Sequence, residues 1–345
     1  MIRSRGAAPG PAVRAINQIT AMIVGLEVIY EFHSHQDLFV TLSTKLFKGP
    51  FELVNNATGS ILDSQGRAWI QGPSAYGVEL ITMLSIALPI AVLRLIGSRA
   101  PKQYILYSLA TVVLLYAMVA TDRKSALIVP AAVFLTLACY RRRDLVSLVP
   151  LGFVGAAIAL VAAPASIKDV IAQFTAPGAS QVATVSSRTA NYDAIRPDLW
   201  THLLFGRGQG TYAPPTDRIV DSEIILRLVE TGVLGLVAFL LIPLAVVVIA
   251  HKTASRRDLR WSPPALCGTA AAACFLVAAM LYSVMSLPHG PDVFMCVAGL
   301  TAAVVGPEEV PLEAPRAERR EAFRRRWAPA AVRVGVVRAR AVPRG

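Results

Sequence analysis

The stretch "DSEIILRLVETGVLGLVAFLLIPLAVVVIA", residues 221 to 250, decides the fold class of this chain. Its second part, from residue 231 to residue 250, carries no charged side chain. A helix that crosses the hydrocarbon core of a bilayer needs roughly 20 apolar residues, and this part is long enough to do so. Its first part holds Asp221, Glu223, Arg227 and Glu230. The stretch therefore predicts a membrane helix with charged residues at its mouth.

The rest of the chain repeats the apolar pattern. Of the 345 residues, 54% are hydrophobic and 16% are charged, which is too apolar for one soluble domain. The excess lies in about eight blocks that could each span a bilayer. These blocks are 12–31, 74–97, 103–121, 125–140, 145–164, 228–250, 264–286 and 290–306. We expect an all-α polytopic membrane protein.

The placement of charge predicts a topology. The net charge of +12 could indicate a nucleic-acid partner, but much of the excess lies in 141–144, 251–260 and the segment 307–345. Short basic segments beside apolar helices are typical of cytoplasmic flanks. We therefore expect no nucleic-acid partner, a cytoplasmic N-terminus (1–11), a transmembrane domain (12–306) and a basic cytoplasmic tail (307–345). Segments 32–73 and 165–227 are expected to be extracytoplasmic.

One basic pair runs against this topology. The stretch "TDRKS" (121–125) places Arg123 and Lys124 on the outer face, where positive residues are disfavoured. Asp122 could simply pair with one of them. Alternatively, the two side chains form a cationic site for an anionic group at the membrane surface.

The long outer segment 165–227 is the second place where a site is expected. Loops of this length inside a compact protein are usually functional or disordered. This one is neither of low complexity nor strongly charged, and it contains Trp200 and Tyr212. We expect it to be ordered, with a short amphipathic helix in 188–200 that Pro197 bends.

Four pieces of this region resemble the O-antigen ligase and polymerase family of bacterial membrane glycosyltransferases. They are Arg188, Trp200, the turn "GRGQGTY" (206–212), and Asp221–Ser222 followed after nine residues by Gly232-x-x-Gly235. The order and spacing match the family pattern, but this chain has Asp221 where the family has His. Stretches 66–89 and 121–129 are also similar, so the resemblance covers about residues 60 to 250.

The resemblance implies a GT-C-like fold in the bacterial inner membrane. It also implies a polyprenyl diphosphate-linked glycan as donor, a glycan or lipid as acceptor, and a role in surface polysaccharide assembly. Because negative charge grows on the leaving diphosphate, forked guanidinium donors suit it. Arg188 and Arg123 are the candidates, with Lys124 and Arg207 behind them. We expect no metal and no cofactor.

The remaining candidates surround the acceptor. By the resemblance Asp221 orients the acceptor hydroxyl or takes its proton, although an aspartate is a weak base at neutral pH. Asp221 could instead cap the helix that follows it. Gly208 and Gly210 could bring backbone N–H groups to phosphate. Trp200 and Tyr212 could stack on sugars or simply pack.

Two other function classes stay open. A transporter for a small anion would also use outer arginines, but such proteins carry ionisable residues near the bilayer midplane and broken helices in paired halves. A non-catalytic membrane partner of a polysaccharide assembly system is the other alternative, because the family His is replaced by Asp221.

Overall fold

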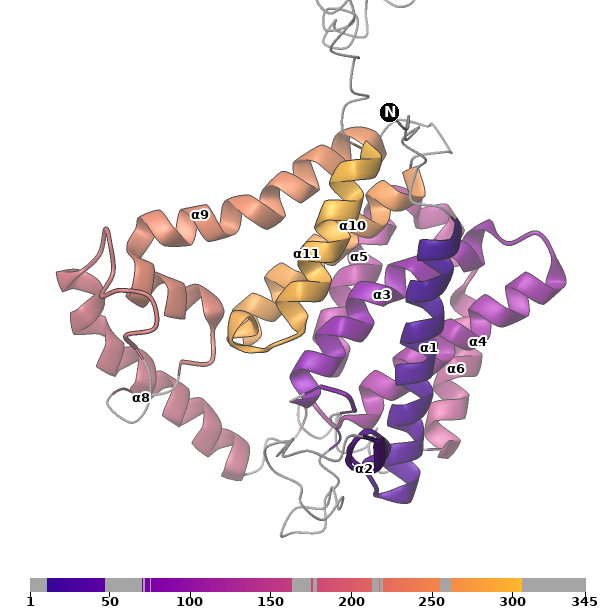
Figure 1. Ribbon diagram of the computed structural model, residues 1–345, viewed down its shortest axis with the longest axis horizontal. Helices are drawn as coiled ribbons and strands as arrows, with labels where there is room; N and C mark the ends of the chain where they lie inside the picture. The colour runs from indigo at the N-terminus through magenta and orange to yellow at the C-terminus, as the bar shows by residue number, and fades with distance from the viewer. Residues whose placement is uncertain are drawn as a thin grey trace, which may run out of the picture. The chain divides into compact units, whose positions relative to one another are not determined.

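The fold is described from a computed structural model (Figure 1), which describes residues 11–46, 70, 72–74, 76–162, 175, 179–212, 217, 220–254 and 262–305. The regular structure within these ranges is helical and contains no β-strand. The predicted all-α class is therefore confirmed. The expected cytoplasmic N-terminus and basic tail lie almost entirely outside the described residues, so the predicted domain limits stay predictions.

A helix forms in each of the eight apolar blocks. The helices that correspond to them are α1 (Pro11–Ser34), α3 (Gly77–Gly97), α4 (Pro101–Ala120), α5 (Ser125–Val146), α6 (Val149–Ala162), α9 (Glu223–Ala254), α10 (Ser262–Leu281) and α11 (Gly290–Val305). Within the described part of the chain, five helices are long and apolar enough to cross a membrane, namely α3, α4, α5, α9 and α10. Membrane-spanning helices are thus confirmed, and the count of eight spans stays a prediction.

The two segments expected to be extracytoplasmic also contain helices. Segment 32–73 includes α2 (Leu38–Leu46), and segment 165–227 includes α8 (Ala179–Thr201). Helix α8 is longer than the predicted helix over 188–200 and continues through Pro197 to Thr201. Its position on the outer side of a membrane stays a prediction.

Helix α10 forms the centre of the bundle and packs against α3, α5, α9 and α11. It is rich in small residues, which allow neighbouring helices to approach closely in lipid. A Cβ atom at Gly268 would lie 2.4 Å from the Thr301 side chain of α11. About two turns further along α10, the Phe275 ring stacks on Phe294 with 4.1 Å between centroids. Close packing of α10 fixes where its C-terminal end lies.

That end of α10 belongs to a cluster of helix ends. We call it the mouth end, defined as the end where α3, α5 and α11 begin and where α4 and α10 end. Gly77 at the start of α3 lies against Thr121 after α4, and a Cβ atom at position 77 would be 3.8 Å from Thr121. The α3 residue Thr82 is hydrogen-bonded to Tyr282, which follows α10. At the opposite end the Tyr140 hydroxyl of α5 contacts His251 Nδ1 of α9 at 2.5 Å.

Helix α9 is interrupted near its beginning. Gly232 has φ 66° and ψ −170°, which separates a first segment (223–231) from a second segment (233–254). The second segment exposes Val237, Leu241, Leu244 and Val248 at helical spacing, as a lipid-facing helix does. A Cβ atom at Gly232 would lie 2.3 Å from the Leu204 carbonyl oxygen. Only glycine fits both the backbone conformation and the space.

The backbone groups freed by the interruption are bound by the turn that follows α8. The carbonyls of Val229 and Glu230 accept the N–H groups of Arg207 and Gly208 at 3.0 and 2.8 Å. The N–H groups of Val233 and Leu234 donate to the carbonyls of Leu203 and Leu204 at 2.8 and 3.3 Å. Since unsatisfied backbone groups are costly in a membrane, this pairing makes the interruption stable.

Gly232→Ala should lower the free energy of unfolding by on the order of 1–3 kcal/mol from backbone strain alone, with the contact to Leu204 adding to it. Thermal unfolding in detergent measures the effect. Gly299→Ala in α11 is the matched control, because a Cβ atom there has nothing within 4 Å. Equal melting temperatures for the two variants would contradict this account of the interruption.

Candidate active site

The turn 202–212 and α8 form a platform against the first segment of α9. Ile195 of α8, Tyr212, Val220 and Val229 make a small apolar cluster under this platform. Gly206 lies so close to α9 that a Cβ atom there would be 2.3 Å from the Glu230 carbonyl. Two motifs recognised separately in the sequence, 206–212 and Gly232-x-x-Gly235, are therefore halves of one structural unit. A Cβ atom at Gly235 would meet the Thr231 side chain one turn earlier on the same helix.

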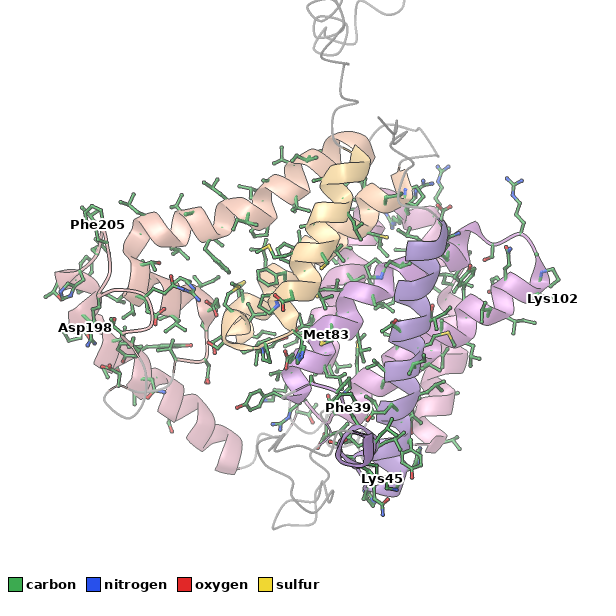
Figure 2. All side chains as sticks on the ribbon, in the orientation of Figure 1. Phe39, Lys45, Met83, Lys102, Asp198 and Phe205 are labelled. Carbon is green, nitrogen blue, oxygen red and sulfur yellow. The ribbon has the colours of Figure 1, made fainter. Side chains whose placement is uncertain are left out.

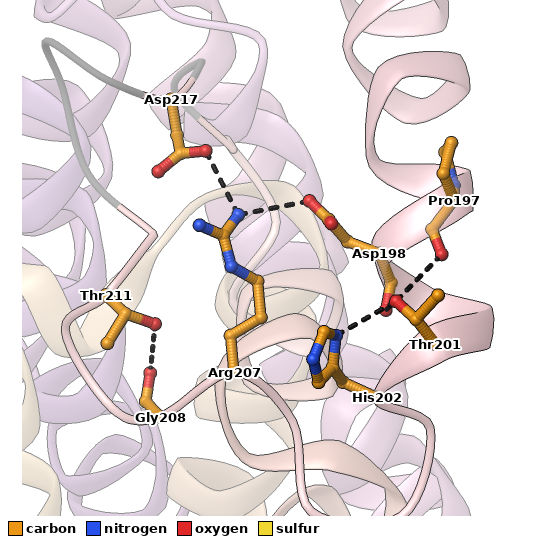
Figure 3. Close-up of polar contacts among 8 residues, drawn as sticks. All are labelled: Pro197, Asp198, Thr201, His202, Arg207, Gly208, Thr211 and Asp217. Carbon is orange, nitrogen blue, oxygen red and sulfur yellow. Dashed lines mark hydrogen bonds and ion pairs between the residues drawn. The ribbon is translucent and has the colours of Figure 1, made fainter.

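Arg207 holds the platform together through two ion pairs (Figure 3). Its Nη1 atom donates to the carboxylates of Asp198 and Asp217, at 3.1 Å each. The guanidinium also lies over the Tyr212 ring, 5.5 Å from its centroid. The hydrogen bond to Asp217 is the largest of the effects that raise the pKa of Arg207 above its ordinary value, and the charge of Asp198 adds to it. Arg207 therefore stays charged, and a ligand would meet its other nitrogen atoms.

A chain of buried charges runs along the first segment of α9. Arg227 Nε donates to Glu223 Oε1 at 2.5 Å, and Arg227 Nη1 lies 3.6 Å from Glu230 Oε2. The pair between Arg227 and Glu230 agrees with their spacing of three residues on a helix. Glu230 Oε1 accepts the Gly210 N–H at 3.0 Å. Buried carboxylates need such partners, and here they tie the glycine turn to the helix.

The backbone N–H groups of Gly208 and Gly210 both donate to Glu230, one to its carbonyl and one to its carboxylate. A phosphate at this turn would have to compete with these bonds. Tyr212 is 7% exposed and packs in the platform, whereas Trp200 on α8 is 71% exposed. Of the two aromatic candidates, Trp200 presents the larger free surface to a sugar.

Asp221 lies just before the first segment of α9. The Leu226 N–H donates to the carbonyl of Ser222 at 2.9 Å, so the N-cap position belongs to Ser222 rather than to Asp221. Ser222 and Glu223 anchor the segment to the mouth end. The Ser222 hydroxyl donates to the Ala279 carbonyl at 3.4 Å, and the Glu223 N–H donates to the Tyr282 carbonyl at 3.3 Å. Asp221 is thereby held beside the connection between α10 and α11.

Arg123 and Lys124 lie on the short connection between α4 and α5, at the mouth end. The chain reverses there at Asp122, which has a φ of 51°. Figure 2 shows Asp198 and Phe205, on and after α8, well to one side of Met83 in α3. The platform helix α8 packs against α9, whereas the α4–α5 connection lies beside the start of α3, where Gly77 is next to Thr121. Arg188 lies on α8, and its side chain is outside the described residues.

The structure adds four residues that the sequence analysis did not select, Glu79, Glu223, Tyr282 and His289. Glu223 was within reach of sequence reasoning, because it stands four residues before Arg227 on one helix. Glu79 at the start of α3 contacts His289 before α11, through its Oε1 atom and His289 Nδ1 at 3.2 Å. Two residues so far apart in the chain leave no local signal. Among the described residues, no group of three or more His, Cys, Asp or Glu side chains is arranged to hold a metal ion.

Glu230→Ala should free the Gly210 N–H and loosen the 206–212 turn. A hydrogen bond to a charged group contributes about 1.5–3 kcal/mol, so amide exchange at Gly210 should rise about tenfold or more. Hydrogen–deuterium exchange followed by mass spectrometry measures it. Glu230→Gln, which keeps an acceptor oxygen, should exchange more slowly than Glu230→Ala. Native-like exchange in Glu230→Ala would show that the carboxylate does not hold the turn.

A comparison with known protein families finds a match to this region of the chain. The family model described as O-antigen ligase matches residues 109–240, and no curated protein matches the chain. The matched range contains every candidate residue from Arg123 to Asp221, as well as the interruption at Gly232. It indicates a membrane enzyme of glycosyl transfer in polysaccharide assembly. Residues 109–240 of this chain are therefore similar to the O-antigen ligase family, in the region where the sequence motifs predicted the resemblance.

Proposed function

We propose that this protein transfers a glycan from a polyprenyl diphosphate carrier to a glycan or lipid acceptor at the outer surface of the bacterial inner membrane. The observation that carries the proposal is the O-antigen ligase match, because it spans the whole set of candidate residues. The geometry supports it. Two motifs of that set, 206–212 and Gly232-x-x-Gly235, form one unit beside Asp221.

In this proposal arginines bind the donor. Transfer breaks the bond between the anomeric carbon and the diphosphate oxygen, and negative charge collects on the leaving group. Arg188 and Arg123, supported by Lys124, neutralise that charge with forked or mobile donors. Arg207 supports them from the platform, because its Nη1 atom is engaged by Asp198 and Asp217. Gly208 and Gly210 shape the turn that carries Arg207.

Asp221 serves the acceptor in this proposal. A carboxylate can accept a hydrogen bond from the attacking hydroxyl and hold it in line with the anomeric carbon. Trp200 offers an exposed aromatic face on which a sugar can stack. Tyr212 supports the platform by packing in its apolar cluster. Attack opposite the leaving diphosphate inverts the anomeric centre.

Anion transport is a second candidate, and the interruption of α9 favours it. Transporters often bind anions at discontinuous helices, where free backbone groups meet the substrate. Here, however, the freed groups around Gly232 are bound by residues 203–208 of the same chain. Liposomes loaded with labelled phosphate would test this candidate directly, because a transporter releases the label without any glycan donor.

Release of polyprenyl diphosphate tests the glycosyl-transfer proposal. Purified protein in liposomes, given a polyprenyl diphosphate-linked oligosaccharide and a glycan acceptor, should release the carrier only when the acceptor is present. Arg188→Ala should reduce the rate by about 100-fold, the usual cost of removing a donor to a developing anion. Asp221→Ala should also reduce it by about 100-fold, because the attacking hydroxyl then has no side-chain acceptor to hold it in line.

Arg142→Ala is the matched control. Arg142 is exposed within the basic segment 141–144 and lies outside the proposed site, so its loss should change the rate less than twofold. No release by folded native protein with several donors would contradict the proposed function. Equal losses in Arg142→Ala and Arg188→Ala would contradict the assignment of the diphosphate site.

A further inference from the structure

His289 lies on the connection between α10 and α11 and is held by a buried carboxylate. Its backbone N–H donates to Glu79 Oε1 at 2.5 Å, and its Nδ1 atom lies 3.2 Å from the same oxygen. The Glu79 side chain is 0% exposed, while the His289 side chain is 52% exposed. One side of the imidazole ring is therefore fixed by the protein, and the other side faces outward.

The contact with Glu79 assigns the tautomer of the neutral ring. Because a carboxylate only accepts hydrogen bonds, Nδ1 carries the hydrogen atom and Nε2 carries the lone pair. A carboxylate that orients an imidazole in this way leaves the opposite nitrogen ready to take a proton. The second contact, to the ring, is the one that a base requires.

The same connection also anchors the segment that carries Asp221. Glu223 Oε2 accepts the Met285 N–H at 3.0 Å, and the Tyr282 hydroxyl donates to the Val78 carbonyl at 3.1 Å. Figure 1 shows the turn between α10 and α11 between the beginnings of α9 and α3. His289 follows Met285 by four residues, which is at most about 14 Å of chain. His289 and Asp221 thus both lie at the mouth end.

We propose that His289 is the general base of the transfer reaction and that Glu79 is the residue that positions it. This inference rests on the proposed function. The acceptor O–H gives its proton to His289 Nε2, and its oxygen forms the new bond to the anomeric carbon. The bond from that carbon to the diphosphate oxygen breaks, and its electron pair leaves with the diphosphate. The imidazolium then returns its proton to water, while Asp221 orients the hydroxyl.

The charged and titratable groups around His289 come from three helices. Glu79 faces it from α3, Glu223 binds the preceding backbone from α9, and Asp292 lies in the first turn of α11. Tyr282 precedes it on the same connection. The rate of a reaction that uses a general base rises with pH until the base is deprotonated, and removal of His289 should abolish that rise.

The test compares four proteins in the liposome release assay, namely native, His289→Ala, His289→Asn and Glu79→Gln. The Asn side chain can still donate to Glu79 from the Nδ1 position but has no second nitrogen. Both His289 variants should lower kcat/KM by about 100-fold and lose the rise with pH. They should bind the donor, measured separately without acceptor, within about twofold of native. Added imidazole should restore part of the rate in His289→Ala.

His251→Ala is the matched control, because this histidine also contacts a partner, Tyr140, but at the opposite end of the bundle. It should keep the native rate and pH profile. Near-native turnover with an unchanged pH profile in His289→Asn would overturn the assignment of the base and leave the proposed function intact. No release by the native chain itself would overturn both. Glu79→Gln should show an intermediate rate, since the amide oxygen still accepts the ring N–H.

Discussion

The structure depends on how the chain satisfies the backbone groups that the interruption of α9 sets free. A helix broken within or near a bilayer exposes N–H and C=O groups that lipid cannot bind. Here the turn after α8 supplies partners on both sides of Gly232, two acceptors from Leu203 and Leu204 and two donors from Arg207 and Gly208. The turn and the interruption thus satisfy each other's backbone groups.

That constraint explains why the charged residues of α9 are buried and yet stable. Because the first segment of α9 changes direction at Gly232, Glu223 reaches the connection between α10 and α11 while Glu230 reaches the glycine turn. Arg227 lies between the two carboxylates. Glu223 and Glu230 thus join the platform to the bundle. Asp221 lies next to that junction.

Sequence reasoning predicted those features that repeat or that follow local spacing. Apolar blocks predicted the helices, and the contact of Arg227 with Glu230 agrees with their three-residue spacing. The packing of Gly206 against Glu230 was not predicted. A glycine is required there only because the folded chain brings these two backbone segments into contact, and the sequence gives no local sign of that contact. The pair of Glu79 and His289 was missed for a similar reason. Only the folding of α3 against the α10–α11 connection brings them together.

The most direct test is to locate the diphosphate of the donor on the chain. A polyprenyl diphosphate carrying a photoreactive group next to the diphosphate would be crosslinked to the protein in liposomes and mapped by mass spectrometry. We expect label in peptides from 121–125 and 179–222, and competition by unmodified polyprenyl diphosphate. Label confined to peptides from the opposite end of the bundle, such as 97–102 or 141–148, would contradict a donor site at the mouth end.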